Sequence, residues 1–283
     1  MKEQTKDNLT ILKEFIVYGF CKSKKIDLFV DNTFKIITLN LRRDVFQDGN
    51  NRWIKRKQNI VDYIKQEKPH VICSQEVMPH MYKYLMRELG YVYSGYSRET
   101  RFGLKLHTVP VSGTIGNSIL YDKHKYNLID KGVFWMSDTP EKMSKGWGNK
   151  EFRNCVYVGL EDKTTKKVFY VFNTHLDHES DNSRKKSLPL LVNKINEISG
   201  DNDFYLMGDF NALIEDLTPL NEVFDSTYNY NKSLTFNSFH NKLTKSLDAI
   251  YFRFGNKFNV DIPNIKLSDH TPVIIYKNAE PSN

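Results

Sequence analysis

The sequence lacks a long uncharged hydrophobic run, and this argues against a membrane span. A helix that crosses a bilayer needs about 20 consecutive apolar residues. The longest apolar stretch near the N-terminus, residues 9–20, is interrupted by Lys13 and Glu14. No small-residue cleavage site follows it, so the stretch is also a poor signal peptide. We therefore expect no membrane span and a cytoplasmic location.

Cysteine is scarce, and the residues that occur are far apart: Cys21, Cys73 and Cys155. They form no thiolate cluster of the kind that holds a structural metal. Two of them lie inside apolar runs that are typical of strands. We expect reduced, buried thiols, as in a cytoplasmic protein.

Internal repeats, low-complexity tracts and linkers rich in Pro, Gly or Ser are also missing, so no internal domain boundary is indicated. Residues 1–33 carry apolar side chains near helical spacing followed by a basic stretch, and we expect a helical extension or arm there. The sequence then predicts one catalytic domain over residues 34–278 and a disordered tail over 279–283. We expect a monomer.

The chain carries an excess of positive charge. Lys and Arg number 41 against 34 for Asp and Glu, which gives a net charge of +7 and an isoelectric point near 9.0. Such a balance favours a polyanionic partner, either nucleic acid or a phosphorylated substrate. The alternative is that the positive charge only reflects general composition, since Lys, Asn and Ile are abundant throughout.

From residue 34 onward, apolar runs alternate with amphipathic stretches. Helical spacing predicts helices over residues 53–67, 82–89 and 188–195. Interleaved strands and helices are typical of a layered α/β fold. The expected strands are rich in β-branched and aromatic residues, and they cover residues 34–39, 71–74, 118–121, 155–160, 168–173, 204–207, 249–252 and 273–276.

Polar side chains that can bind metals or transfer protons lie at the ends of these apolar runs. Carboxylates, imidazoles and carboxamides follow the earlier strands and precede the last two. If the last two strands run antiparallel to the others, all of these groups reach one edge of the sheets, where α/β proteins usually bind ligands. The groups are Asn40, Glu76, His175, Asp209, Asn211, Asp248, Asp269 and His270.

So many carboxylates at one place need a neutralising partner, because like charges raise each other's pKa. Oxygen ligands without thiolates select Mg²⁺, with Mn²⁺ as the alternative. Mg²⁺ is commonly shared with substrate phosphate, and this points to phosphoryl chemistry. Each residue alone has an ordinary explanation, a turn-forming Asp or a structural His. The ordered set as a whole is much harder to explain in that way.

Six short segments carry a specific resemblance to a known family. In chain order they resemble the signature motifs of the endonuclease/exonuclease/phosphatase superfamily, which includes deoxyribonucleases, abasic-site endonucleases, deadenylases and inositol-polyphosphate phosphatases. The resemblance covers residues 34–276 and implies a four-layer α/β sandwich, with two mostly antiparallel, mixed sheets face to face and helices outside. The segments are Thr38-Leu39-Asn40-Leu41-Arg42, Ser74-Gln75-Glu76-Val77, Asn173-Thr174-His175-Leu176-Asp177-His178, Gly208-Asp209-Phe210-Asn211-Ala212, Leu247-Asp248-Ala249-Ile250 and Ser268-Asp269-His270-Thr271-Pro272-Val273.

The resemblance implies a metal site and a mechanism. Glu76 would be the principal metal ligand, with help from Asn40 and Asp269. A metal-activated water would attack phosphorus in line, with inversion and without a covalent enzyme intermediate.

It also implies how protons and phosphate are handled. Asp209 and Asn211 would orient the attacking water and the phosphate. His270, held by Asp248, would be either the general base or a group that polarises the phosphate. His175 would contact the scissile phosphate from the other side.

The segments 134–140, 145–148, 153–155 and 235–239 look like those of a bacterial branch of the superfamily. Arg153 is the best candidate for a second phosphate contact, and a surface Arg at a strand start is the alternative. Asn237 and Trp147 are candidates for substrate contacts. Ala212 and Leu213 follow Asn211 where inositol phosphatases carry Tyr-Arg, which disfavours an inositide substrate.

Three functions remain open, of which a nuclease or phosphodiesterase is the first. Basic residues that could track a nucleic-acid backbone support it, although a solvated helix face also explains several of them. The second is a phosphomonoesterase that acts on a small phosphorylated metabolite such as a sugar or lipid head group, and the third a catalytically inactive binding module. The basic residues are Arg42, Arg43, Arg52, Lys55, Arg56, Lys57, Arg184, Lys185 and Lys186.

Overall fold

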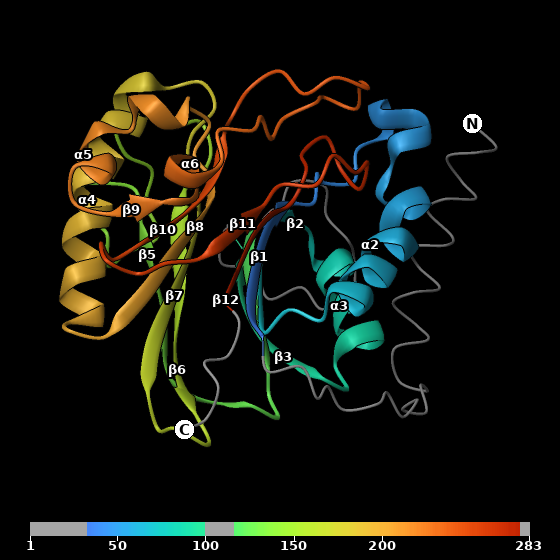
Figure 1. Cartoon of the computed structure of the whole chain (residues 1–283). Helices are drawn as coiled ribbons and strands as arrows, with labels where there is room; N and C mark the ends of the chain where they lie inside the picture. The colour runs from blue at the N-terminus through green and yellow to red at the C-terminus, as the bar shows by residue number, and fades with distance from the viewer. Residues whose placement is uncertain (1–32, 100–115, 278–283) are drawn as a thin grey trace.

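Two six-stranded β-sheets pack face to face in the computed structural model, which describes residues 33–99 and 116–277. Helices cover the outer face of each sheet, so the molecule has four layers (Figure 1). The expected four-layer α/β sandwich is therefore confirmed. Apart from Thr33, the arm expected over residues 1–33 and the tail over 279–283 lie outside the described residues.

The first sheet has the strand order β11-β12-β1-β2-β4-β3, and only β1 and β2 in it run parallel. A helical crossover, α2 (Trp53–Glu67), joins these two strands, as parallel neighbours require. The strands are β1 (Phe34–Asn40), β2 (Val71–Val77), β3 (Tyr93–Glu99), β4 (Gly116–Asp122), β11 (Asn259–Asp261) and β12 (Val273–Lys277).

The second sheet has the order β5-β6-β7-β8-β10-β9, and its parallel pair is β7 with β8. Helix α4 (Asp181–Ser199) makes the crossover, and its N-cap Ser180 accepts a hydrogen bond from the Ser183 amide at 3.1 Å. The strands are β5 (Tyr126–Trp135), β6 (Asn154–Asp162), β7 (Val168–His175), β8 (Asp203–Asp209), β9 (Asp225–Ser226) and β10 (Asp248–Phe252).

The three predicted helices are present. Helix α2 ends at Lys68, which adopts a left-handed conformation just before Pro69, and α3 (Pro79–Leu89) begins with proline in its first turn. The four edge strands, β3, β5, β9 and β11, were not predicted. Strands β3 and β5 are rich in polar residues, and β9 and β11 are only two and three residues long. Short helices complete the fold: η1 (Phe46–Asn51), η2 (Ile214–Asp216), α5 (Thr218–Asn221) and α6 (Thr227–Tyr230).

Three hydrophobic clusters fill the spaces between the four layers. One lies between the sheets, one between the first sheet and helices α2 and α3, and one between the second sheet and α4. Cys73 and Cys155 are free and fully buried, as expected, whereas Cys21 lies outside the described residues. No helix within residues 33–99 and 116–277 is long and apolar enough to cross a membrane.

A buried polar contact links the two sheets beneath the edge that carries Glu76. The Asn173 side chain of β7 donates to the carbonyl oxygens of Ser74 at 3.0 Å and Ser118 at 2.9 Å. Its own oxygen accepts a hydrogen bond from Gln75 at 2.7 Å. Because buried polar groups are costly when unpaired, these bonds specify how the sheets are aligned.

We expect the Asn173→Ala variant to lose about 3 kcal/mol of unfolding free energy. It removes the side-chain donor of the Ser74 and Ser118 carbonyls and one of the two acceptors of the Gln75 amide, which keeps only the Thr38 hydroxyl. Urea denaturation followed by circular dichroism measures this. The exposed Asn264 is a matched control, and Asn264→Ala should change stability by less than about 0.5 kcal/mol. A loss below about 1 kcal/mol at Asn173 would show that the contact does not align the sheets.

Candidate active site

The polar residues at the strand ends meet at one edge of the two sheets. Strand β10 runs antiparallel to β8 and places Asp248 directly opposite Asp209, while β12 runs antiparallel to β1. The parallel pair β7 and β8 aligns His175 with Asp209. The expected convergence is therefore confirmed, with the difference that several of these residues belong to the strands and do not follow them: Asn40, Glu76, His175, Asp209 and Asp248.

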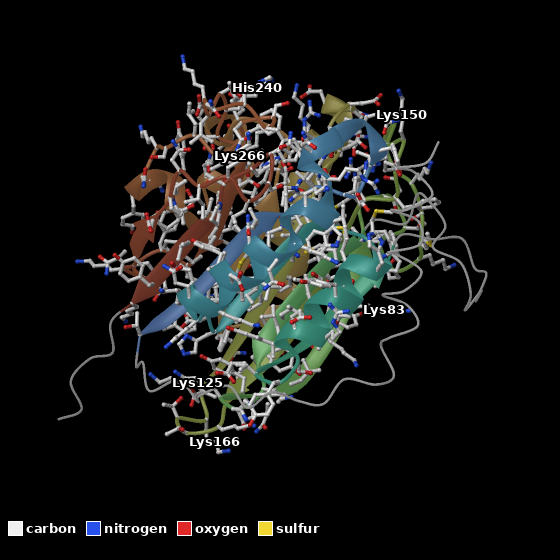
Figure 2. The ribbon with its side chains drawn as sticks, turned by 90° about the vertical axis from the view of Figure 1, so that its right-hand side faces the viewer. Lys83, Lys125, Lys150, Lys166, His240 and Lys266 are labelled. Carbon is white, nitrogen blue, oxygen red and sulfur yellow. The ribbon has the colours of Figure 1, made fainter. Side chains whose placement is uncertain are left out.

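A cavity of about 700 Å³ opens at this edge. It lies at the end of the molecule that carries His240, opposite the end that carries Lys166 (Figure 2). Its volume is in the usual range for ligand sites. The lining residues are Arg42, Arg43, Gln47, Asp48, Asn51, Glu76, Glu151, Arg153, His175, His178, Asp209, Asn211, Phe236, Ser238, Phe239, His240, Lys245, Leu247, Asp269 and His270.

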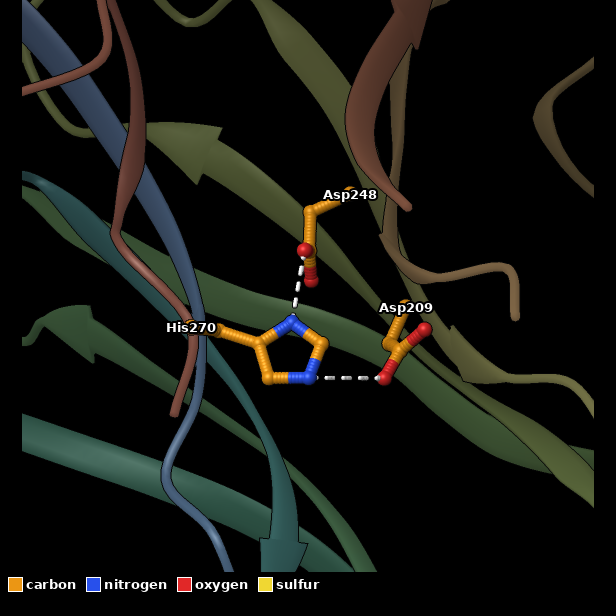
Figure 3. Close-up of side chains that lie close together, drawn as sticks. All are labelled: Asp209, Asp248 and His270. Carbon is orange, nitrogen blue, oxygen red and sulfur yellow. Dashed lines mark hydrogen bonds and ion pairs between the residues drawn. The ribbon is translucent and has the colours of Figure 1, made fainter. Parts of the chain in front are cut away.

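His270 lies between two carboxylates, as Figure 3 shows. Its Nδ1 bonds to Asp248 Oδ2 at 2.7 Å, and its Nε2 lies 3.6 Å from Asp209 Oδ2. The Thr235 hydroxyl also donates to Asp248 Oδ2, at 2.6 Å. The Asp248 contact therefore fixes the ring orientation and leaves Nε2 toward the cavity, as the expected pairing requires.

These contacts shift the pKa values of both His270 and Asp209. Burial opposes the charge on His270, but Asp248 and Asp209 outweigh it and raise the pKa of His270 to about 10. Burial raises the pKa of Asp209 to about 7, against the attraction of His270. His270 is consequently a cation at neutral pH, and Asp209 is poised to exchange a proton.

Glu76 and Asp269 form the acidic side of the cavity. Burial disfavours the charge on Glu76, yet the backbone N–H of Arg43, at 3.0 Å from Oε2, and the nearby Arg42 lower the pKa of Glu76. Burial raises the pKa of Asp269, and its Oδ1 accepts a hydrogen bond from Ser268. Glu76 is thus ionised, as a principal metal ligand must be.

Asn40 contacts both sides of the site. Its Nδ2 donates to Asp209 Oδ2 at 2.9 Å and to Glu76 Oε1 at 3.3 Å, while its Oδ1 accepts the Arg42 N–H at 2.9 Å. In this orientation Asn40 holds two carboxylates in place. Its expected role as a direct metal ligand stays a prediction.

The donor set fits a divalent metal. Asp209, Asp248 and His270 offer ligand atoms within 4.8 Å of one another, and Asp248 Oδ1 is buried without a hydrogen-bond partner among the described residues. Asp248 is bonded to His270 and does not line the cavity, whereas Glu76 and Asp269 do, so these two carboxylates are better placed to hold a metal beside a substrate. Hard oxygen donors of this kind suit a hard cation.

His175 and Asn211 form the opposite wall. The Asn211 side chain donates to His175 Nε2 at 2.8 Å and to the Leu176 carbonyl at 3.0 Å. Burial lowers the pKa of His175 well below its usual value, so the ring is neutral and Nε2 is an acceptor. A hydrogen bond from Nε2 to phosphate would require this contact to change, and the expected phosphate contact of His175 stays a prediction.

Arg153 reaches the cavity from the start of β6. It is only 5% exposed, and it contacts Asp177 at 3.4 Å through Nε and His178 Nδ1 at 2.9 Å through Nη2. The alternative interpretation of a surface Arg is therefore wrong. Two backbone N–H groups, from Glu179 and Ser180, hold Asp177 in turn.

Two other expected substrate residues do not line the cavity. The indole N–H of Trp147 donates to Asp138 at 2.8 Å, and the Asn237 side chain accepts the Phe239 N–H at 2.7 Å to close a turn. The neighbours Phe236 and Ser238 line the cavity instead. Thr235, from the same segment, was missed because a hydroxyl that supports a carboxylate has no sequence signature of its own.

Two of the basic residues proposed to track nucleic acid are structural. Arg52 pairs with Asp44 at 3.0 Å, and Arg56 donates to the carbonyls of Leu41 and Leu267. Both side chains are buried, so they cannot follow a phosphate backbone at the surface.

Backbone strain concentrates around the same cavity. A positive φ is uncommon in residues other than glycine, and residues held there often cluster at functional sites. Of eight such residues in the described chain, five line this cavity: Arg42, Glu76, Asn211, Ser238 and Phe239. Glu76, at φ 58°, sits where the register between β2 and β4 shifts.

Comparisons with known proteins show the family and the fold. A family model described as the endonuclease/exonuclease/phosphatase family matches residues 37–270. An endonuclease/exonuclease/phosphatase from Bacteroides vulgatus is 26% identical, with a TM-score of 0.75 over 86% of this chain and 98% of that one. A mannosyl-6-phosphatase from Bacteroides thetaiotaomicron is 24% identical, with a TM-score of 0.76 and the same coverage. An uncharacterized protein of Acanthamoeba polyphaga mimivirus is 28% identical over 271 residues, 85% of this chain and 98% of that protein.

Fold and site together define a hydrolase that acts on phosphate esters. The chain belongs to the endonuclease/exonuclease/phosphatase family, as the six motifs predicted. Enzymes of this family generally depend on a divalent metal, and the carboxylates described above could hold one.

Metal binding should depend on Glu76. At about ten times its Kd, Mg²⁺ should stabilise the native protein by about 1.4 kcal/mol. Scanning calorimetry should show this as a rise in Tm of about 3–5 °C. Glu76→Gln should abolish the rise, whereas Glu222→Gln, an exposed control outside the cavity, should keep it. An undiminished rise in Glu76→Gln would place the metal elsewhere.

Proposed function

We propose that this protein is a Mg²⁺-dependent phosphoesterase that hydrolyses a phosphodiester bond in nucleic acid by in-line attack of water. The observation that carries the proposal is the convergence of three carboxylates and two imidazoles on one cavity, Glu76, Asp209, Asp269, His175 and His270, with a fourth carboxylate, Asp248, bonded to His270. A cytoplasmic location and a monomeric state remain part of this proposal.

Mg²⁺ is favoured, with Mn²⁺ as the alternative, because Glu76 and Asp269 offer only oxygen. When bound, the ion neutralises charge on the phosphate and lowers the pKa of a coordinated water. The ionised Glu76, with Asn40 bonded to it, would hold the ion beside the scissile phosphate.

Asp209 and His270 have different roles in proton transfer and in stabilising charge on the phosphate. A pKa near 7 suits Asp209 to accept a proton from the attacking water. The raised pKa of His270 favours a cation that stabilises negative charge on the phosphate, and this argues against a general base. Asp248 keeps His270 oriented and charged.

The walls of the cavity favour a nucleic-acid strand. Arg43, Arg153 and Lys245 supply positive charge that suits a phosphate backbone. Phe236 and Phe239 offer aromatic faces against which a base or sugar can pack. Phe236 also contacts the His270 ring edge to face, with centroids 4.9 Å apart.

A phosphomonoesterase is the second candidate, and the size of the cavity favours it. A volume of about 700 Å³ holds a whole phosphorylated sugar or lipid head group. The mannosyl-6-phosphatase shares the fold, and its substrate shows that the fold accommodates such chemistry. An inactive binding module is disfavoured, since every motif keeps its polar group.

Asp209→Asn should reduce kcat by a factor of about 10² to 10⁴, because the variant loses its proton acceptor. In the native enzyme Asp209 is protonated and ineffective at low pH, so kcat/KM should rise with pH, with an apparent pKa no higher than about 7. Asp209→Asn should lose this rising limb, and the exposed Asp201→Asn should keep it.

His270→Ala should cost about 10² or more in rate. Full activity in either site variant would show that the roles are misassigned.

The proposed function is tested with purified protein, Mg²⁺ and a substrate panel. The panel contains single-stranded RNA, single- and double-stranded DNA, bis(p-nitrophenyl) phosphate and phosphomonoesters that include mannose 6-phosphate. We expect cleavage of nucleic acid that weakens steeply as salt rises, because a polymer displaces counterions on binding. Strong turnover of monoesters with inert polymers would favour the second candidate.

A further inference from the structure

A second groove of about 630 Å³ adjoins the catalytic cavity. The two share Asn211, Lys245 and Leu247 in their walls. Asn211 is also the residue that holds His175. The groups of the candidate active site therefore lie where the cavity and the second groove meet. A substrate that extends beyond its reacting phosphate can therefore pass from one into the other.

The walls of the second groove are amphipathic. Leu213, which is 40% exposed, and Leu247 supply apolar surface. Lys245 is exposed, and its ammonium group has no partner among the described residues. Two carboxylates also line the groove, and one of them, Asp181, is paired with Lys185 at 2.8 Å.

Arg184 and Lys185 also line the groove, and both pair with Asp181. The Nη1 of Arg184 donates to the main-chain carbonyl of Asp177 at 2.7 Å, and the Asp177 side chain contacts Arg153 in the catalytic cavity. The Nε of Arg184 is buried and has no hydrogen-bond partner within the described chain.

We infer that the second groove binds the nucleotide next to the scissile phosphate of a nucleic-acid strand, with Lys245 against its phosphate and Leu213 against its sugar or base. This inference rests on the proposed function. An alternation of charge and apolar surface matches a strand, in which each nucleotide carries one phosphate and one apolar ring face. A small monoester would fill the catalytic cavity alone and leave the second groove without a role.

The test compares a single-stranded oligonucleotide of about 12 nucleotides, long enough to cover both hollows, with bis(p-nitrophenyl) phosphate, which lacks further phosphates. Lys245→Met should raise KM for the oligonucleotide about tenfold more than KM for the small diester. The slope of log kcat/KM against log salt for the oligonucleotide should also become shallower by about 0.7, as expected for one lost phosphate contact to a single strand.

Leu213→Glu places a negative charge in the second groove and should raise KM for the oligonucleotide in the same selective way. Lys166→Met is the matched control at the opposite end of the molecule, and both of its KM values should equal those of the native enzyme (Figure 2). Thermal unfolding of each variant checks that the fold is kept.

The possible failures are distinguishable. If the native enzyme cleaves the oligonucleotide but Lys245→Met and Leu213→Glu change both KM values equally or not at all, the second groove does not bind the strand. If the native enzyme hydrolyses small esters and leaves the oligonucleotide intact, the proposed function itself is wrong.

Discussion

The structure depends on one electrostatic constraint, the collection of buried carboxylates at a single edge. Uncompensated, such charges would raise one another's pKa and oppose folding. The protein compensates them unequally. Glu76 receives a backbone N–H and the nearby Arg42, whereas Asp209 receives an amide and an imidazolium and keeps a pKa near 7. This inequality keeps Glu76 ionised on the same cavity in which Asp209 exchanges a proton near neutral pH.

The same constraint explains why polar residues occur deep between the sheets. The bonds from Asn173 to the first sheet set the relative position of β2 and β7, and Glu76 and His175 follow within two residues on those strands. A purely apolar interface would allow the sheets to slide, because hydrophobic contact is not directional. Catalytic groups on opposite sheets require a fixed alignment, and the buried amides supply it.

Much of the site could be predicted from the sequence, because strand-terminal polar residues keep their place once the strand order is set. Glu76, Asp209 and His270 are of this kind. Trp147 and Asn237 lie in irregular segments, where periodicity gives no direction for a side chain, and the structure turns both away from the cavity. Charge alone was a poor guide as well: Arg52 and Arg56 appear as surface charge in the sequence, but buried carboxylate and carbonyl partners hold them inside.

The strand order has a consequence for biosynthesis. Strand β12, near the end of the chain, pairs with β1, near its beginning, and the residues just before β12 complete the catalytic edge. A nascent chain therefore cannot close its first sheet or assemble the acidic cluster until residue 277 has left the ribosome. Any polypeptide that ends before residue 269 lacks both Asp269 and His270 at this edge.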